Sequence, residues 1–242
     1  MMEVVAQYAR ELGIDLTPAQ VGLFETYYHQ LIEWNQKINL TRITGYEEVQ
    51  ARHFLDSLTL VPVLREEFPS SDDTPLRVID IGAGAGLPGL PLKIALPELE
   101  LVLIESTAKK VMFLRHLVDV LGLDGVEVKL GRAEELAHQS NLRESFDLCL
   151  ARAVAALPTL VELALPFVRL GGFFVAHKST AIDDELAASA NALRILGGNV
   201  KQVREVQLNS IVSPRVLVII EKVVLTPSSY PRRPGLPSKR PL

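Results

Sequence analysis

Short apolar runs alternate with helical patterns from residue 76 onward, and this alternation limits the folds that the chain can adopt. The apolar runs predict strands at 76–82, 99–105, 126–131, 146–153, 171–178 and 215–223. Helical spacing separates them, at 87–97, 107–123, about 157–167 and 181–196. Strands that alternate with helices form a mainly parallel sheet covered on both faces. The sequence therefore predicts an α/β fold whose binding sites lie at the carboxyl ends of the strands.

Residues 1–65 carry helical patterns instead. Thr17 and Pro18 are a suitable N-cap and first residue for a helix that runs to about Lys37. A second helix is expected over about 46–63, and the segment 70–75 reads as a loop. We expect a helical N-terminal extension at 1–70, a sheet domain at 71–226 and a basic tail at 227–242.

Composition excludes several classes of protein. The 242 residues carry a net charge of −4 and a single cysteine, Cys149, so neither a disulfide framework nor a cysteine-rich metal site is expected. Cys149 lies within an apolar strand and is expected to be an inert core residue. No apolar run is long enough to cross a membrane, and the N-terminus lacks a signal pattern. We expect a soluble, cytoplasmic protein without a metal.

The first predicted strand ends in a glycine-rich loop that fits two cofactors. Gly84, Gly86 and Gly89 match the dinucleotide pattern G-x-G-x-x-G. Asp80, Gly82, Gly84 and Gly86 match D-x-G-x-G-x-G, the loop of S-adenosylmethionine (SAM) methyltransferases. A carboxylate before the loop repels a pyrophosphate but favours the ammonium and sulfonium of SAM. The sequence therefore favours SAM over a dinucleotide.

Two later strand ends add to the nucleoside site. Glu105 ends the second strand, where an acid accepts hydrogen bonds from ribose hydroxyls of NAD and SAM alike. Ala133 and Glu134 follow the third strand, where loop backbone or the acid can meet the adenine edge. Glu134 fits a helix N-terminus equally well. These residues indicate a nucleoside without telling which one.

Arg152 stands after the fourth strand, beside the expected position of the methyl group. A motif that is common at this position in one class of methyltransferase is absent here. The Asn/Asp-Pro-Pro-aromatic motif of methyltransferases that act on the exocyclic amines of bases is missing there. An arginine suits an anionic or hydrogen-bond-accepting substrate, such as a phosphate or guanine. It also suits an ion pair with Asp147 or another neighbour. Lys178, at the end of the fifth strand, is a weaker candidate for a phosphate contact.

Charged and polar residues outside the sheet remain open to two interpretations. Asn39 and Thr41 are candidates for contacts or for helix caps, and His53 and Asp56 share a helix face and can pair. No acidic residue follows Glu221, whereas the last eleven residues contain the cations Arg232, Arg233, Lys239 and Arg240. This tail serves either a phosphate-rich partner or solubility.

Seven segments taken in order resemble one family. These segments are WNQKINLT (34–41), RHFLDSL (52–58), DIGAGAGLPGLPLKI (80–94), KKVMFL (109–114), GRAEE (131–135), ARAVA (151–155) and YPRRPGLPSKRPL (230–242). They are similar to the RsmG, or glucose-inhibited division protein B, family over about residues 30–242. Leu87, where phenylalanine is frequent, and Ser179, where glycine is frequent, depart from the pattern.

The resemblance implies a 16S rRNA guanine-N7 methyltransferase that uses SAM. It implies a Rossmann-like class I fold, with a seven-stranded, mostly parallel sheet and a helical N-terminal extension. The partner would be 16S rRNA, the small ribosomal subunit or its assembly intermediate, with no obligate protein partner. Guanine N7 has no proton to lose, so positioning and electrostatics would carry the reaction without a general base.

The resemblance also assigns roles to residues. Gly82 and Leu87 would belong to the cofactor loop, Glu105, Ser106 and Thr107 would lie beside the ribose, and Ala133 and Glu134 would flank the adenine. Arg152 would sit at the methyl-transfer site. We hypothesise that Arg152 positions the target nucleotide, with Asn39, His53 and Lys178 as weaker candidates and the basic tail gripping phosphates.

Alternatives from other classes remain. A small-molecule methyltransferase would turn over without RNA. A NAD-dependent oxidoreductase or a nucleotide-binding regulator would bind a nicotinamide cofactor in place of SAM. A non-enzymatic ribosome-binding module would bind rRNA without methyl transfer.

Overall fold

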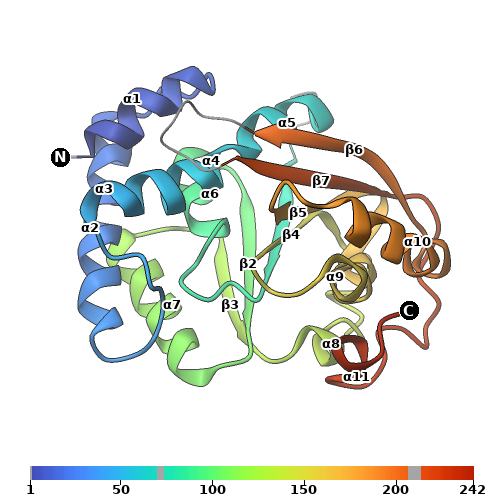
Figure 1. Ribbon diagram of the computed structural model, residues 1–242. Helices are drawn as coiled ribbons and strands as arrows, with labels where there is room; N and C mark the ends of the chain where they lie inside the picture. The colour runs from blue at the N-terminus through green and yellow to red at the C-terminus, as the bar shows by residue number, and fades with distance from the viewer. Residues whose placement is uncertain (1, 70–73, 207–213) are drawn as a thin grey trace.

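A seven-stranded sheet forms the centre of the computed structural model, which describes residues 2–69, 74–206 and 214–242 (Figure 1). The strand order is β3-β2-β1-β4-β5-β7-β6. β7 is antiparallel to both of its neighbours, and the other strands run parallel to one another. The strand order reverses between β1 and β4, which is where such sheets open a crevice for ligands.

Helices and strands alternate through most of the sheet domain. The strands are β1 (Arg77–Ile81), β2 (Glu100–Glu105), β3 (Val126–Leu130), β4 (Phe146–Arg152), β5 (Val168–Lys178), β6 (Gly198–Val206) and β7 (Arg215–Lys222). The N-terminal helical elements are α1 (Glu3–Glu11), α2 (Pro18–Asn35), α3 (Tyr46–Val49), a π-helix (Gln50–Leu55), α4 (Asp56–Leu58) and α5 (Leu60–Glu67). The later ones are α6 (Gly89–Ala95), α7 (Ala108–Leu121), α8 (Ala133–Leu136), α9 (Leu157–Ala164), a 3-10 turn (Leu165–Phe167), α10 (Asp183–Leu196) and α11 (Leu236–Lys239).

Successive residues of the central strands enter opposite cores, as the two-residue period of a strand requires. Val78 packs into a core with the N-terminal helices, α6 and α7, whereas Ile79 packs into a core with α8, α9 and α10. Figure 1 shows these two groups of helices on opposite sides of the sheet. The N-terminal helices thus bury their apolar faces in a core shared with the sheet. The predicted boundaries at 70 and 226 stay a prediction.

The start of α2 is confirmed, and its cause is local. The Thr17 hydroxyl accepts a hydrogen bond from the amide of Gln20, whose side chain accepts one from the amide of Thr17. This reciprocal capping box, with Pro18 in the first turn, satisfies two amides that a helix start leaves open. No helix within the described ranges has the length and apolar character needed to cross a membrane.

The six strands expected from the apolar runs are all present, and two features differ from the sequence prediction. β6 was missed because it is an edge strand whose apolar residues are interrupted by charged ones such as Lys201 and Arg204. The segment expected to be one helix at 46–63 is broken by the π-helix and continues through α5 to Glu67. π-turns of this kind occur mainly at functional sites.

Candidate active site

The loop between β1 and α6 is held open by glycines. Gly82, Gly84 and Gly86 have φ angles of 69°, 57° and 89°, a region that other residues rarely adopt. The amides of Gly82 and Ala83 donate to the carbonyl of Ile104, which fastens the loop to β2. A side chain at Gly84 would be strained and would project into open space beside Gly82. Leu87, later in the loop, is half-buried against the N-terminal core. The loop therefore presents bare backbone at the switch point of the sheet.

Asp80 supports this loop from beneath. It is fully buried, and its Oδ2 accepts a hydrogen bond of 2.9 Å from the amide of Gly89, the first residue of α6. Oδ1 has no hydrogen-bond partner among the residues described. Burial raises the pKa of Asp80 to about 7. The sequence analysis placed Asp80 beside the cofactor's cationic groups; the structure instead shows a buried carboxyl that holds the start of α6.

Glu105 lies at the end of β2, directly beside the glycine loop. Its carboxylate accepts hydrogen bonds from the amide of Gly84 at 3.1 Å and from the amide of Thr107 at 2.8 Å. The side chains of Ser106 and Thr107 are exposed at the rim. A carboxylate oxygen accepts more than one hydrogen bond, so Glu105 keeps acceptor capacity toward the loop. The glycine loop, Glu105 and the exposed Ser106 and Thr107 lie together, as the sequence predicted.

Glu134 is turned to a different partner from the one expected. Its Oε1 accepts a hydrogen bond of 2.9 Å from the amide of Gly235 in the C-terminal tail. Glu134 is only 7% exposed, whereas Ala133 beside it is half-buried at the start of α8. The structure thus corrects the adenine role of the Glu134 side chain and leaves Ala133 and the local backbone at the end of β3.

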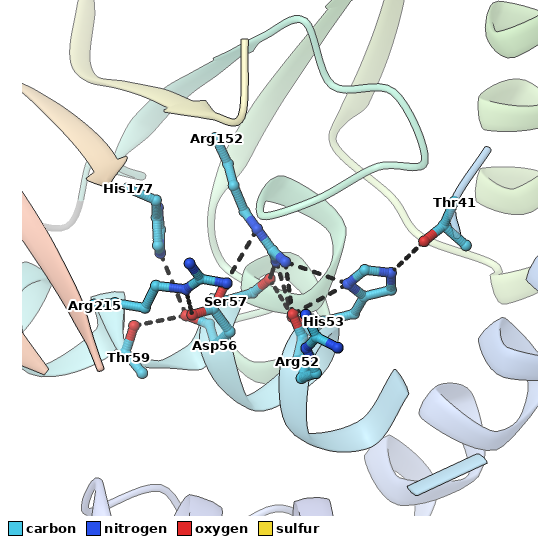
Figure 2. Close-up of polar contacts among 9 residues, drawn as sticks. All are labelled: Thr41, Arg52, His53, Asp56, Ser57, Thr59, Arg152, His177 and Arg215. Carbon is cyan, nitrogen blue, oxygen red and sulfur yellow. Dashed lines mark hydrogen bonds and ion pairs between the residues drawn. The ribbon is translucent and has the colours of Figure 1, made fainter. Parts of the chain in front are cut away.

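Arg152, at the end of β4, is enclosed by the segment 52–57 (Figure 2). Its Nε lies 3.2 Å from Oδ2 of Asp56, and one terminal nitrogen contacts the carbonyl of His53 and the hydroxyl of Ser57. The other terminal nitrogen contacts the carbonyl of Arg52 at 2.6 Å and Nδ1 of His53 at 3.2 Å. A guanidinium has five N–H donors, and five partners surround this one.

This geometry corrects the role expected for Arg152. All three of its nitrogens contact the segment 52–57, and only 13% of the side chain is exposed, so Arg152 faces the protein interior. The alternative of an ion pair applies, but with Asp56; Asp147 pairs with Arg169. Arg152 joins the sheet edge to the N-terminal helices.

The π-helix makes main-chain carbonyls of this segment available to Arg152. A π-turn widens the helix and displaces the carbonyls of one turn from their usual amide partners. The carbonyls of Arg52 and His53 lie in this turn, and both accept from Arg152. The RHFLDSL segment thus supplies a ring of oxygen acceptors for one guanidinium.

His53 connects Arg152 to the loop after α2. Its Nδ1 lies 3.1 Å from the carbonyl of Arg52 and 3.2 Å from a terminal nitrogen of Arg152, and its Nε2 lies 2.7 Å from the hydroxyl of Thr41. Burial and the Arg152 charge lower the pKa of His53 to about 4. His53 is 6% exposed, so it supports the site and does not face RNA. The expected pairing of His53 with Asp56 is replaced by the contacts that both make with Arg152.

A loop after β4 separates the glycine loop from a pocket. Ala153 has a φ of 56°, which is unusual for a residue with a side chain. Val154 lies over Gly82, where an added Cβ would come within 2.8 Å of its Cγ2. A pocket of about 280 Å³ is lined by Asp56, Arg152, Ala153, Ala155, His177, Lys178, Ser179, Glu185 and Arg215.

Lys178 in this pocket is already paired. Its Nζ lies 2.6 Å from the Glu185 carboxylate and 2.9 Å from the carbonyl of Ala155. Its side chain is 11% exposed, so the structure corrects the expectation of a free phosphate contact. Sequence reasoning missed His177, Glu185 and Arg215. Arg215 was detectable in principle, because the first residue of an antiparallel strand lies at the carboxyl edge of its parallel neighbours.

The basic tail is folded onto α8 and α9. Arg232 forms a two-pronged ion pair with the buried Glu162, and Arg143 donates to carbonyls of the tail. Arg232 is therefore an anchor, which corrects its expected role as a phosphate contact. The side chains of Arg233, Lys239 and Arg240 are exposed and unpaired within the described part of the chain, and Asn39 is exposed after α2.

Cys149 is confirmed as a core residue. It is fully buried in β4, and burial raises the pKa of its thiol well above the ordinary value. A thiol that stays protonated is a poor nucleophile.

Comparison with known proteins identifies relatives of the whole chain. Residues 20–213 match the family model GidB, described as rRNA small subunit methyltransferase G. A protein of Moorella thermoacetica named ribosomal RNA small subunit methyltransferase G is 48% identical over 239 residues, which is 99% of this chain and 97% of the relative. The protein of that name from Halalkalibacterium halodurans is 46% identical over 236 residues, 98% of this chain and 97% of the relative.

Solved structures share the fold at low sequence identity. A mutant form of MtNAS has a TM-score of 0.54 at 18% identity, over 91% of this chain and 86% of that one. M. jannaschii TYW2, solved in complex with AdoMet, has a TM-score of 0.50 at 15% identity, over 66% of this chain and 74% of that one. These similarities confirm the fold expected from the alternating strands and helices.

Proposed function

The chain belongs to the GidB family of rRNA small subunit methyltransferases, and we propose that its glycine loop, Glu105 and the pocket beside Arg152 perform the family's reaction. The protein is a SAM-dependent enzyme that methylates N7 of a guanine in 16S ribosomal RNA. The observation that carries this conclusion is identity of 43–48% to curated relatives over nearly the whole chain.

The cofactor-binding residues of the proposal fit SAM. Gly82 and Gly84 offer bare backbone, Gly86 packs against Leu90 and Tyr27 to shape the loop, and Glu105 offers acceptors beside the exposed Ser106 and Thr107 for the ribose. Leu87 and Ala133 line the same region from the loop and from the end of β3. Asp80 and Glu134 act through the backbone that they hold. SAM, when bound, supplies the electrophilic methyl group.

Methyl transfer to guanine N7 requires the protein to position the substrate and does not require a general base. The N7 lone pair is free, so no proton leaves that atom. His53 and His177 stay neutral at pH 7, since burial lowers the pKa of each to about 4. A rigid site that aligns the lone pair with the methyl group provides the main acceleration. Arg152 is a positioning residue in this proposal, because it locks β4 to the segment 52–57.

Exposed cations on the tail fit the RNA substrate. We assign Arg233, Lys239 and Arg240 to phosphate contacts and Asn39 to a polar RNA contact, because their side chains face solvent. The partner is the small subunit or an assembly intermediate that exposes the target guanine. We place the reaction in the cytoplasm, where such subunits are.

The test is transfer of labelled methyl from SAM to small subunits from a strain without this enzyme, followed by digestion to nucleosides. Labelled 7-methylguanosine is expected. The matched control is Gly84→Val, whose side chain would be strained and would fill the open space beside Gly82, so SAM binding and label should both vanish. SAM binding without label in RNA would overturn the ribosomal substrate and favour a small-molecule methyltransferase.

A further inference from the structure

Two buried polar atoms without hydrogen-bond partners belong to side chains that line the pocket beyond β4, β5 and β7. They are Oδ1 of Asp56, whose side chain is 2% exposed, and Nδ1 of His177, which is 5% exposed. Oδ1 has only an ion-pair contact, 3.6 Å from Nε of Arg215. Buried polar atoms without hydrogen bonds are rare, and each calls for a partner.

Both atoms are acceptors. Asp56 is flanked by two cations, with Arg152 3.2 Å from its Oδ2 and Arg215 3.6 Å from its Oδ1. Nε2 of His177 lies 3.3 Å from the main-chain carbonyl of Asp56, so the ring proton belongs on Nε2. Nδ1 of the neutral ring is then left as a lone-pair acceptor. A single partner that satisfies both atoms brings two donors.

Among the RNA bases, guanine alone has two adjacent donors on its Watson–Crick edge, N1–H and the N2 amine. Adenine and cytosine each present one amine beside an acceptor nitrogen, and uracil presents one N–H between two carbonyls. Enzymes that modify a single base commonly read that edge in a pocket. A pair of acceptors therefore favours guanine and rejects the other three bases.

We propose that Asp56 and His177 read the target base, accepting hydrogen bonds from N1–H and the N2 amine of guanine within this pocket. The inference rests on the proposed function and names its specificity residues. Arg215, whose side chain is 32% exposed, covers Oδ1 of Asp56 and turns aside when the base enters. Its guanidinium then lies near the guanine O6, a hydrogen-bond acceptor.

The position of the pocket fits this role. Ala153 and Ala155 line it, and Val154 between them lies over Gly82 of the glycine loop. A base in the pocket and a cofactor on the glycine loop would thus lie beside the same short loop. At about 280 Å³ the pocket lies just below the range for drug-sized ligands, which suits a single base.

Small subunits reconstituted with a changed target nucleotide test the proposal. Inosine removes the N2 amine, and 2-aminopurine removes N1–H together with O6; both keep N7. We expect the wild-type kcat/KM to fall about tenfold to hundredfold on each analogue, because a buried acceptor loses its donor. His177→Gln keeps a donor toward the Asp56 carbonyl and removes the Nδ1 acceptor; Asp56→Asn replaces the charged acceptor.

Each of these two variants should lose most of the preference for guanine over one of the analogues, while SAM affinity measured by equilibrium dialysis stays within about twofold. Thr180→Ala, an exposed neighbour of the pocket that is not part of its lining, should keep both preferences. If Asp56→Asn does not fold, His177→Gln decides alone. Equal wild-type rates on guanosine and both analogues, or full preferences in His177→Gln, would overturn the proposal. Failure of the proposed function would give a different result, because the wild-type protein would then leave even subunits with guanosine at the target position unmethylated.

Discussion

At the end of β4, the three nitrogens of one guanidinium contact acceptors of the N-terminal helices, and Asp56 lies 3.2 Å from that guanidinium and 3.6 Å from Arg215. Burial lowers the pKa of Arg152, whereas the neighbouring Asp56 raises it. A buried ion pair broken from one side leaves an uncompensated charge, and this is far more costly than losing an exposed pair.

Arg152→Ala should therefore lower the free energy of unfolding by about 3–5 kcal/mol, as measured by urea denaturation. The matched control is Arg169→Ala, which breaks an ion pair with Asp147 in which the arginine side chain is 47% exposed. That change should cost less than about 1 kcal/mol. Similar values for the two variants would show that Arg152 does not brace the fold.

The two buried histidines predict how stability depends on pH. Burial lowers the pKa of His53 and His177 to about 4, against about 6.5 in the unfolded chain. Between these values the unfolded chain binds the extra protons, so stability falls as pH falls, by about 1.4 kcal/mol per pH unit for each histidine. Asp80 opposes this, because burial raises its pKa to about 7 and the folded carboxyl holds a proton that the unfolded one releases above about 3.9.

His177→Gln should remove about 1.4 kcal/mol per pH unit from the slope of unfolding free energy against pH between about 4 and 6.5. Urea denaturation at a series of pH values measures that slope. His29→Gln, which changes a side chain 67% exposed, is the matched control and should leave it unaltered. A wild-type slope retained by His177→Gln would mean that this histidine is already protonated in the folded protein.

At the scale of elements, the C-terminal tail is an anchored part of the structure. Arg232 pairs with Glu162, whose side chain is 1% exposed, and the amide of Gly235 donates to the buried Glu134. Removing residues 230–242 would take these donors away from both carboxylates, together with the rest of the packing of the tail on α8 and α9. We expect the unfolding free energy to drop by about 3 kcal/mol or more. If the truncated protein is as stable as the full chain, the tail does not stabilise the fold and is a solvated segment, the alternative that its composition also allowed.

Elements with strong local signals were predictable, and those set by long-range contacts were not. Thr17, Pro18 and Gln20 indicate the start of α2, and the loop from Asp80 to Gly86 indicates the nucleoside site because only glycine tolerates its backbone. The π-helix carries no such signal, since it depends on the contacts of Arg152 some 100 positions later in the chain. The partners of Arg152, Glu134 and Arg232 could not be predicted either, because each of them lies far away in the sequence.

At the scale of the whole molecule, one edge of the sheet collects the residues of the candidate site. The glycine loop, Glu105, the Arg152 pocket and the start of α8 all follow the carboxyl ends of parallel strands. The tail crosses α8 and α9, and the hydroxyl of Thr159 near the start of α9 donates to the carbonyl of Pro237. Exposed cations on this tail therefore lie close to the reacting edge of a protein whose net charge is −4.

That placement predicts a local effect on RNA binding. Replacing Arg233, Lys239 and Arg240 together by glutamine removes three exposed cations without touching the Arg232–Glu162 anchor, so the unfolding free energy should change by less than about 1 kcal/mol. If each cation contacts one phosphate, the slope of log affinity against log salt should become shallower by about 2 to 3, measured by filter binding to small subunits over a potassium chloride series. The control replaces Arg194, Lys201 and Arg204 by glutamine, which removes the same charge from α10 and the edge strand β6 (Figure 1). An equal change of slope in both triple variants would mean that net charge alone attracts the RNA, whereas a change confined to the tail variant would assign the phosphate contacts to the tail.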